Sequence, residues 1–230
     1  MSPSEAGRFE IYGMAGEPML ALGPAEAARR LLIVPPLFDE MNRMRRTLLL
    51  VMRRLADGGI CSALIDLPGT GESRSPIAAQ SLEGWRAALL AAAKTFGATH
   101  VLTVRGGALL DTSCHLPVMR LAPVAGASLV RTMVRARLAA DKEAGRPTTR
   151  EALWAEAGPG GAIELAGWPL PVALLEAIEA AVPAARPDLM EVAIGGGGIA
   201  GSPLWLRAEP GEDRVLGQSL AERLIGWMGE

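Results

Sequence analysis

Three side chains in the sequence could act as a nucleophile or as its base. Cys114 is followed directly by His115, and Ser73 lies in a turn-rich segment earlier in the chain. A thiol or hydroxyl beside an imidazole can attack an acyl carbon while the imidazole accepts the proton. Neighbouring residues in a strand point to opposite faces, so adjacency alone does not predict a working pair. Ser73, Cys114 and His115 are therefore weak candidates for catalysis.

A carboxylate, Asp66, opens the sequence Asp-Leu-Pro-Gly-Thr-Gly at residues 66–71. The Asp-x-x-Gly pattern also occurs in GTPases, where a separate glycine-rich loop supplies a lysine to the phosphates. Neither lysine of this chain, Lys94 or Lys142, follows a glycine. The pattern therefore indicates the end of a strand followed by a tight turn, and it excludes a nucleotide site.

The elements that must position these residues follow from apolar periodicity. Residues 9–12 and 19–22 are short apolar runs separated by glycines and a proline, which predicts an antiparallel hairpin. Strands are further predicted at residues 31–34, 60–67, 100–104, 118–124, 189–194 and 204–206. Helical stripes are predicted at residues 41–55, 82–96 and 216–227, and residues 127–182 are predicted to be mostly helix.

Strands that alternate with helices predict a parallel sheet covered on both faces. An opening hairpin, strand–helix repeats and a late helical insertion are typical of an α/β-hydrolase. The sequence therefore predicts one α/β-hydrolase-like domain over residues 1–230, with a mostly parallel central sheet, helices on both faces and a small helical cap at 127–182.

In this fold the nucleophilic serine lies in a strained Gly-x-Ser-x-Gly turn after a central strand. Residues 103–107 occupy that place, with Arg105 where the serine belongs and Gly107 as the last glycine. Arginine stays protonated and cannot attack a carbonyl carbon. The triad also requires a histidine late in the chain, whereas His100 and His115 both precede the predicted cap. The Ser–Asp–His triad is absent from the sequence.

The loop after the first buried strand would contribute to the oxyanion hole of an active enzyme. Here that loop contains Asp39 and Glu40, whose negative charge opposes the stabilisation of an oxyanion. We predict that Arg105 forms an ion pair with Asp39 or Glu40 and fills the former catalytic position. In the alternative, Arg105 points into solvent and the two acids only cap the following helix.

Composition narrows the class of protein. The chain has 230 residues, of which 50% are hydrophobic, and 23 basic residues against 25 acidic ones, with a net charge of -2. This excludes a disordered chain and the basic surface of a nucleic-acid-binding protein. Cys61 and Cys114 lack metal-ligand spacing, so we expect no metal and no cofactor. No apolar run is long enough to span a membrane, and the first seven residues lack signal-peptide features, which predicts a cytoplasmic protein.

Residues 35–42 (Pro-Pro-Leu-Phe-Asp-Glu-Met-Asn), followed by Arg45 and Arg46, resemble a segment of the exosortase A system-associated hydrolases. These are α/β-hydrolase-like proteins encoded beside bacterial exosortase and exopolysaccharide genes. The similarity continues through residues 65–73 and 104–110, and the second type of these proteins also has arginine in the turn. Further matching segments are residues 122–126, 163–170 and 203–205 with Glu209. Asp39 departs from the family pattern, which has glutamate there.

The resemblance implies a set of pocket residues: Asp39, Glu40, Asn42, Arg45, Asp66, Arg105 and Glu209. It implies no reaction, because the name of the family follows from its fold. Our first hypothesis is a catalytically degenerate protein that binds a small anionic ligand, or a partner protein, in an exosortase-linked pathway. The alternative is an active hydrolase or acyltransferase that uses a displaced nucleophile on an ester, thioester or acylated glycan. A third hypothesis is a structural subunit whose cap residues Trp154 and Trp168 contact a partner.

Overall fold

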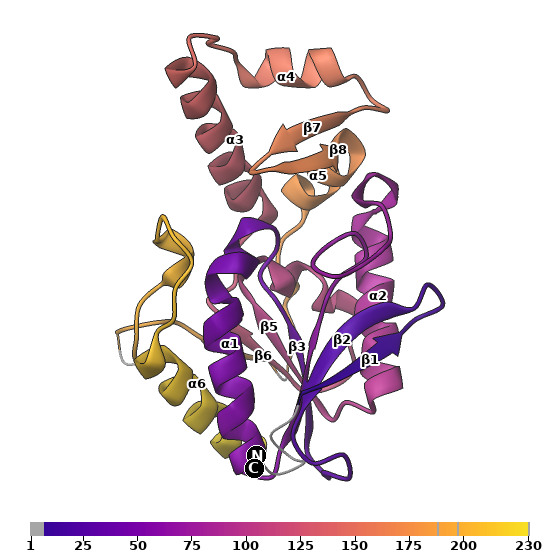
Figure 1. The fold of residues 1–230 in the computed structure, drawn as a ribbon, viewed down its shortest axis with the longest axis vertical. Coiled ribbons are helices and arrows are strands. Elements are labelled where there is room, and N and C mark those ends of the chain that lie inside the picture. Colours follow the sequence, from indigo (N-terminus) through magenta and orange to yellow (C-terminus); the bar gives the residue numbers. More distant parts are fainter. Residues whose placement is uncertain (1–6, 188, 197, 230) are drawn as a thin grey trace.

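The architecture is a mixed sheet with helices on both faces and a smaller layer above one end (Figure 1). The computed structural model describes residues 7–187, 189–196 and 198–229. Most of the N-terminal segment considered for a signal peptide therefore lies outside the described residues. The strands are β1 (Arg8–Tyr12), β2 (Glu17–Leu22), β3 (Arg30–Val34), β4 (Cys61–Ile65), β5 (His100–Val104), β6 (Val118–Leu121), β7 (Ala162–Leu165), β8 (Trp168–Pro171) and β9 (Leu189–Val192).

The helices alternate with the strands. They are α1 (Asp39–Asp57), α2 (Leu82–Phe96), α3 (Gly126–Glu143), α4 (Arg150–Ala157), α5 (Val172–Ala180) and α6 (Arg214–Trp227), with short 3₁₀ turns η1 (Ile77–Ala79), η2 (Arg105–Leu109), η3 (Asp111–Ser113) and η4 (Leu204–Leu206). The hydroxyl of Ser81 accepts a hydrogen bond from the Gly84 N–H and begins α2, and Gly97, with φ 66°, ends it. Both boundaries were predicted from the sequence.

The main sheet has the order β1-β2-β4-β3-β5-β6-β9 among the described residues. The hairpin strand β2 pairs antiparallel with β4, and all later neighbours pair in parallel. The predicted, mostly parallel sheet is thus confirmed. Because the carboxyl ends of parallel strands meet at one edge, the segments that follow β3, β4, β5 and β6 converge there.

Two hydrophobic cores lie on the two faces of this sheet. Successive residues of β3 alternate between them: Leu31 and Ile33 pack with α1 and α6, whereas Leu32 and Val34 pack with α2. This double burial explains why the strand sequence is continuously apolar rather than alternating. The predicted helices on both faces are confirmed.

The segment between β6 and β9 rises above the end of the sheet as α3, α4, β7, β8 and α5 (Figure 1). The prediction that this segment is mostly helix is wrong over β7 and β8, which form a hairpin. Ile163 and Leu165 are buried while Glu164 is exposed, the period-two pattern of a strand. Ala166 and Gly167 both have positive φ, as a tight hairpin turn requires.

The last predicted strand is also wrong. Residues 204–206 form the 3₁₀ turn η4, in which the Leu206 N–H donates to the Pro203 carbonyl. Leu204 is buried and Leu206 is exposed. This three-residue run therefore contributes one side chain to the core and does not pair as a strand. The predicted strands at 60–67, 118–124 and 189–194 are present but shorter, and they end at Ile65, Leu121 and Val192.

Candidate functional site

The turn at residues 103–107, at the end of β5, has the backbone of a nucleophile elbow, the strained turn that carries the serine in active α/β-hydrolases, but it has no nucleophile. We call this turn the elbow. Arg105 has φ 54°, in the left-handed region that side chains other than glycine rarely adopt. At Gly107 a Cβ atom would lie 2.6 Å from the Pro35 carbonyl oxygen, so only glycine fits. The strained strand-to-helix geometry that normally exposes a serine therefore presents a guanidinium.

Arg105 is held by three kinds of contact. Its Nε and Nη2 donate to the two carboxylate oxygens of Glu40 at 3.1 and 3.0 Å, and its Nη1 donates to the Ala122 carbonyl at 3.2 Å. The guanidinium carbon lies 4.3 Å from the ring centroid of Trp205. The side chains of Arg105 and Glu40 are only 15% and 13% exposed. The predicted ion pair is confirmed with Glu40, and the alternative of a solvent-directed Arg105 is wrong.

The second acid of the loop, Asp39, has a different partner. Its carboxylate pairs with Arg43 one turn further along α1. Adjacent helix positions differ by about 100° in direction, because a turn holds 3.6 residues. Only one of the two acids can therefore face the elbow, and Glu40 occupies that position.

Trp205 lies where the chain order of a triad would place its histidine, in the segment before the last helix. Arg43 donates to the Trp205 carbonyl at 2.8 Å, and Arg105 stacks on its ring. The indole has a single N–H donor and no basic nitrogen. The side chain that covers the elbow therefore cannot act as a general base.

The displaced-nucleophile candidates do not meet. The Ser73 hydroxyl accepts hydrogen bonds from the Gly69 and Ser75 N–H groups and so holds its own turn. Cys114 is buried, and burial raises the pKa of its thiol, which disfavours the reactive thiolate. His115 is exposed. Within the described part of the chain, no hydrogen bond joins any two of these three side chains.

The other histidine lies at the wrong end of the sheet. His100 begins β5, whereas the elbow follows the end of that strand. The ring of His100 packs against Trp227 at 4.8 Å between centroids, and its Nδ1 lies 2.9 Å from the Thr99 hydroxyl. Burial lowers the pKa of this imidazole. Among the described residues, neither histidine forms a hydrogen bond with the residues of the elbow.

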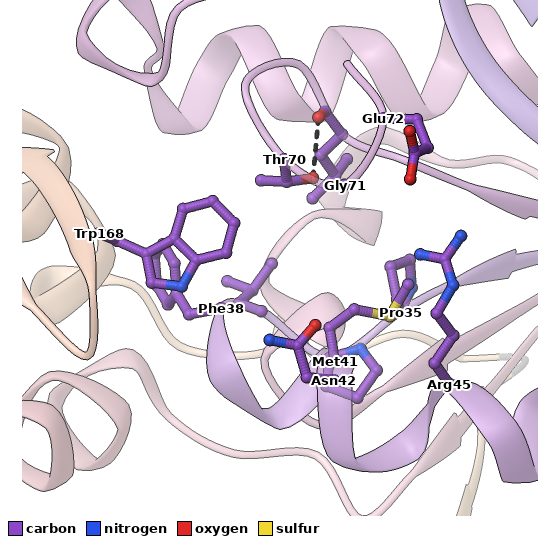
Figure 2. A pocket seen from close by; sticks show the side chains of 12 residues that line it. Pro35, Phe38, Met41, Asn42, Arg45, Thr70, Gly71, Glu72 and Trp168 are labelled. Carbon is purple, nitrogen blue, oxygen red and sulfur yellow. Dashed lines mark hydrogen bonds between the residues drawn. The ribbon is translucent and has the colours of Figure 1, made fainter. Parts of the chain in front are cut away.

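A cavity of about 370 Å³ opens beside the elbow, between the start of α1, the turn after β4 and the cap (Figure 2). Phe38 and Met41 supply apolar surface from one side, and Trp168 covers it from β8. Asn42 and Arg45 bring polar groups from the next turn of α1. Asn42 and Arg45, which were predicted as pocket residues, line this cavity. Phe38, Met41 and Trp168 also line it but were not predicted as pocket residues.

Asp66 lies behind this cavity. Its carboxylate accepts from the Glu72 N–H at 3.0 Å and lies 3.5 Å from Nη1 of Arg45. Burial raises the pKa of the Asp66 carboxyl, and the Glu72 N–H and Arg45 oppose that rise. A Cβ on Gly71 would overlap this carboxylate at 2.4 Å, which explains the glycine in the turn.

A smaller cavity, of about 150 Å³, contains Arg105 and Glu40. Leu37 and Phe38 line both cavities and so form the wall between them. The seven residues predicted as one pocket are thus separated: Asp39, Glu40 and Arg105 line the smaller cavity, Asn42 and Arg45 line the larger one, Asp66 lies behind it, and Glu209 is exposed and lines neither.

Two further properties can be stated for the described residues. No three His, Cys, Asp or Glu side chains in residues 7–187, 189–196 and 198–229 are arranged to hold a metal ion. No helix in the same residues is long and apolar enough to cross a membrane.

Comparison with known proteins gives matches in structure and none in sequence. No protein-family model matches the chain, and no curated protein matches it. A thioesterase domain from the curacin biosynthetic pathway aligns over 98% of this chain and 100% of that domain, with a TM-score of 0.55 and 12% identity. A lidless α/β serine hydrolase from Xanthomonas campestris aligns over 55% of this chain, with a TM-score of 0.41 and 17% identity. Potato epoxide hydrolase aligns over 50%, with a TM-score of 0.41 and 16% identity.

The alignments cover 64% of the Xanthomonas hydrolase and 40% of the potato enzyme, so this chain spans less than two thirds of their length. At these identities the likeness shows the fold alone. The chain has the α/β-hydrolase fold, which confirms the predicted fold class.

Proposed function

We propose that this protein is a non-catalytic α/β-hydrolase-fold protein that binds a small anionic ligand in the larger cavity, within an exosortase-linked pathway. The pathway rests on the resemblance of residues 35–46 to the exosortase-associated family, and a cytoplasmic location stays a prediction. The observation that carries the non-catalytic part is the bidentate Arg105–Glu40 pair at the elbow.

This pair leaves the elbow without reactive groups. A charge-assisted, bidentate contact in a partly buried site is among the stronger polar interactions in proteins. The guanidinium has no lone pair to donate, and Glu40 occupies the side from which a ligand carboxylate would bind. An anion at Arg105 would have to displace Glu40 and leave that carboxylate without its partner. Arg105 is therefore a structural group and not the binding group.

Arg45 is better suited to bind a ligand. Its one ion-pair contact within the described residues is the 3.5 Å approach to Asp66, which is long for a hydrogen bond, and 32% of its side chain is exposed. Most of its five N–H donors are therefore available to a carboxylate or phosphate. Trp168 and Phe38 supply apolar area in the same cavity. This combination favours an amphipathic anion with an aromatic or aliphatic body.

The non-catalytic part is tested by assaying the purified protein with short-chain and long-chain p-nitrophenyl esters. We expect turnover no faster than that of a heat-denatured sample. Turnover above that control, abolished by a phosphonate inhibitor, would contradict the proposal and favour the alternative of a displaced nucleophile.

The binding part is tested with benzoate as the anionic probe and benzamide as its neutral counterpart. The indole N–H signal of Trp168, identified by its loss in Trp168→Phe, should shift saturably with benzoate and not with benzamide. Arg45→Gln should weaken benzoate binding about tenfold, the effect of roughly one charge-assisted hydrogen bond.

Arg46→Gln is the matched control, because Arg46 is the next residue of α1 and points to solvent, where it pairs with Glu212. An equal loss in both variants, or no saturable shift with benzoate, would contradict an anion site at Arg45.

A further inference from the structure

The outer strand of the sheet carries a surface that the proposed function does not use. β1 ends the sheet and, among the described strands, pairs only with β2. Phe9 and Ile11 project from the same face of β1 and are 74% and 69% exposed. Figure 1 shows β1 as the outermost strand on its side of the sheet. Two large apolar side chains are therefore exposed on an edge strand.

The two faces of β1 differ. On one face Tyr12 is buried in the core formed with α2. On the other face α1 covers Leu22 and Leu64 of the neighbouring strands, but the described helices leave Phe9 and Ile11 uncovered.

Natural sheets protect such edges with short strands, charged side chains such as lysine, proline, a bulge or a covering element. The two charges of β1, Arg8 and Glu10, lie on the face opposite Phe9 and Ile11. The β1 sequence, Arg-Phe-Glu-Ile-Tyr, contains neither lysine nor proline.

We propose that β1 pairs antiparallel with β1 of a second copy of this chain, joining two sheets across a two-fold axis. The charges of the strand support this occupant. With Phe9 on the axis, Phe9 of each copy lies opposite Phe9 of the other, and Arg8 of each copy lies opposite Glu10 of the other. An isologous interface needs a patch of this kind, which is complementary to itself.

Neighbouring registers lack this complementarity. An axis at Glu10 would place two carboxylates directly opposite each other, which is destabilising. An axis at Ile11 would place Glu10 opposite Tyr12, so neither Glu10 nor Arg8 would face an opposite charge on the other copy. In the structure Arg8 and Glu10 already lie 3.6 Å apart along one strand, on the same face of β1. Arg8 also donates from Nη1 to the Gly23 carbonyl at 2.9 Å, so an exchange of the Glu10 contact between copies uses the remaining donors of Arg8 and requires no change of face.

Space on the uncovered face is compatible with a second copy. An open groove of about 600 Å³ lies between Phe9, Ile11 and Pro18 of the hairpin and the side chains of Arg45, Glu72 and Arg74, so Arg45 and Glu72 border both this groove and the larger cavity. An aromatic side chain from the opposing strand can enter it. Because β1 has five residues, the interface is smaller than that of a permanent dimer, so the dimer should dissociate on dilution.

Sedimentation velocity of the full chain at increasing concentration tests the proposal. The wild type should pass from monomer to dimer, and Phe9→Lys should stay a monomer at every concentration. Val182→Lys is the matched control, since Val182 is also a large exposed apolar residue but follows α5. Circular dichroism checks that both variants are folded.

A charge exchange tests the register. Arg8→Glu alone and Glu10→Arg alone should each be monomeric, because each places like charges opposite each other. An equimolar mixture should form a heterodimer, because each of the two facing pairs then joins an acid to a base. A monomeric wild type, a dimer that persists in Phe9→Lys, or a mixture that stays monomeric would each overturn the proposal.

Discussion

Two arginines at the carboxyl ends of the parallel strands differ in how many of their donors the protein itself occupies. Arg105, after β5, donates to both oxygens of Glu40, stacks on Trp205 and is largely shielded from solvent. Arg45, in the second turn of α1, approaches one oxygen of Asp66 at 3.5 Å and faces the larger cavity. The first has little capacity left for a ligand, whereas most donors of the second are available.

The comparison shows that the residue at the nucleophile position of the fold need not be the arginine with free donors. The elbow places Arg105 at the carboxyl end of β5, in the middle of the sheet. There Glu40 and the Ala122 carbonyl accept its hydrogen bonds. The larger cavity lies on the other side of Leu37 and Phe38. If the proposed anion site is correct, a search centred on the elbow alone would miss Arg45.

A third arginine, Arg120, is fully buried, and we expect the loss of its partner to lower the free energy of unfolding more than any other change considered. Arg120 of β6 donates from Nε and Nη2 to Asp111 at 2.8 and 2.6 Å, and both side chains are buried. Asp111→Asn should lower the free energy of unfolding by about 3–5 kcal/mol, because it leaves a buried charge without its main partner. Urea denaturation measures this loss.

The control is the double variant Asp111→Leu with Arg120→Met, which replaces both charges by apolar groups. It should recover most of the stability, since a buried ion pair often contributes little more than well-packed apolar residues. A double variant as unstable as Asp111→Asn would show that the pair itself stabilises the fold.

Loss of the Arg105–Glu40 pair at the elbow should have an intermediate effect on the free energy of unfolding. Glu40→Gln should lower the free energy of unfolding by about 1–3 kcal/mol, because the partly buried Arg105 loses its counter-charge but keeps Ala122 and Trp205. The corresponding change Asp39→Asn should lower the free energy of unfolding by less than about 1 kcal/mol, because its partner Arg43 is more exposed. Equal losses at both positions would contradict the structural distinction between the two acids.

We expect the smallest effect from Asp66, whose ionisation makes the free energy of unfolding depend on pH. Burial raises the pKa of this carboxyl above its unfolded value, so its contribution favours folding at low pH and is lost as the pH rises through the folded pKa. Asp66→Asn removes the titration. The free energy of unfolding of the variant relative to wild type should therefore increase from about pH 4 to about pH 7. A difference that is constant over this range would contradict the assignment.

Local patterns were sufficient to predict much of the chain. The Ser81 cap and the Gly97 stop of α2, the continuous apolar run of β3 and the hairpin of β1 and β2 depend on neighbouring residues only. The β7–β8 hairpin was missed because its strands have four residues each and lie between helices, where a short apolar pattern fits either structure.

The amino-acid sequence by itself determined that the elbow has no nucleophile, since Arg105 replaces the serine and both histidines precede the cap. Only the tertiary structure decided that Glu40 and not Asp39 binds Arg105, because the direction of a side chain depends on the rotation of α1 against the sheet. It also decided that Trp205 covers the elbow and that Trp168 joins Arg45 in one cavity. Even the nearest of these contacts, Glu40 with Arg105, joins residues 65 positions apart, and no local pattern encodes such a contact.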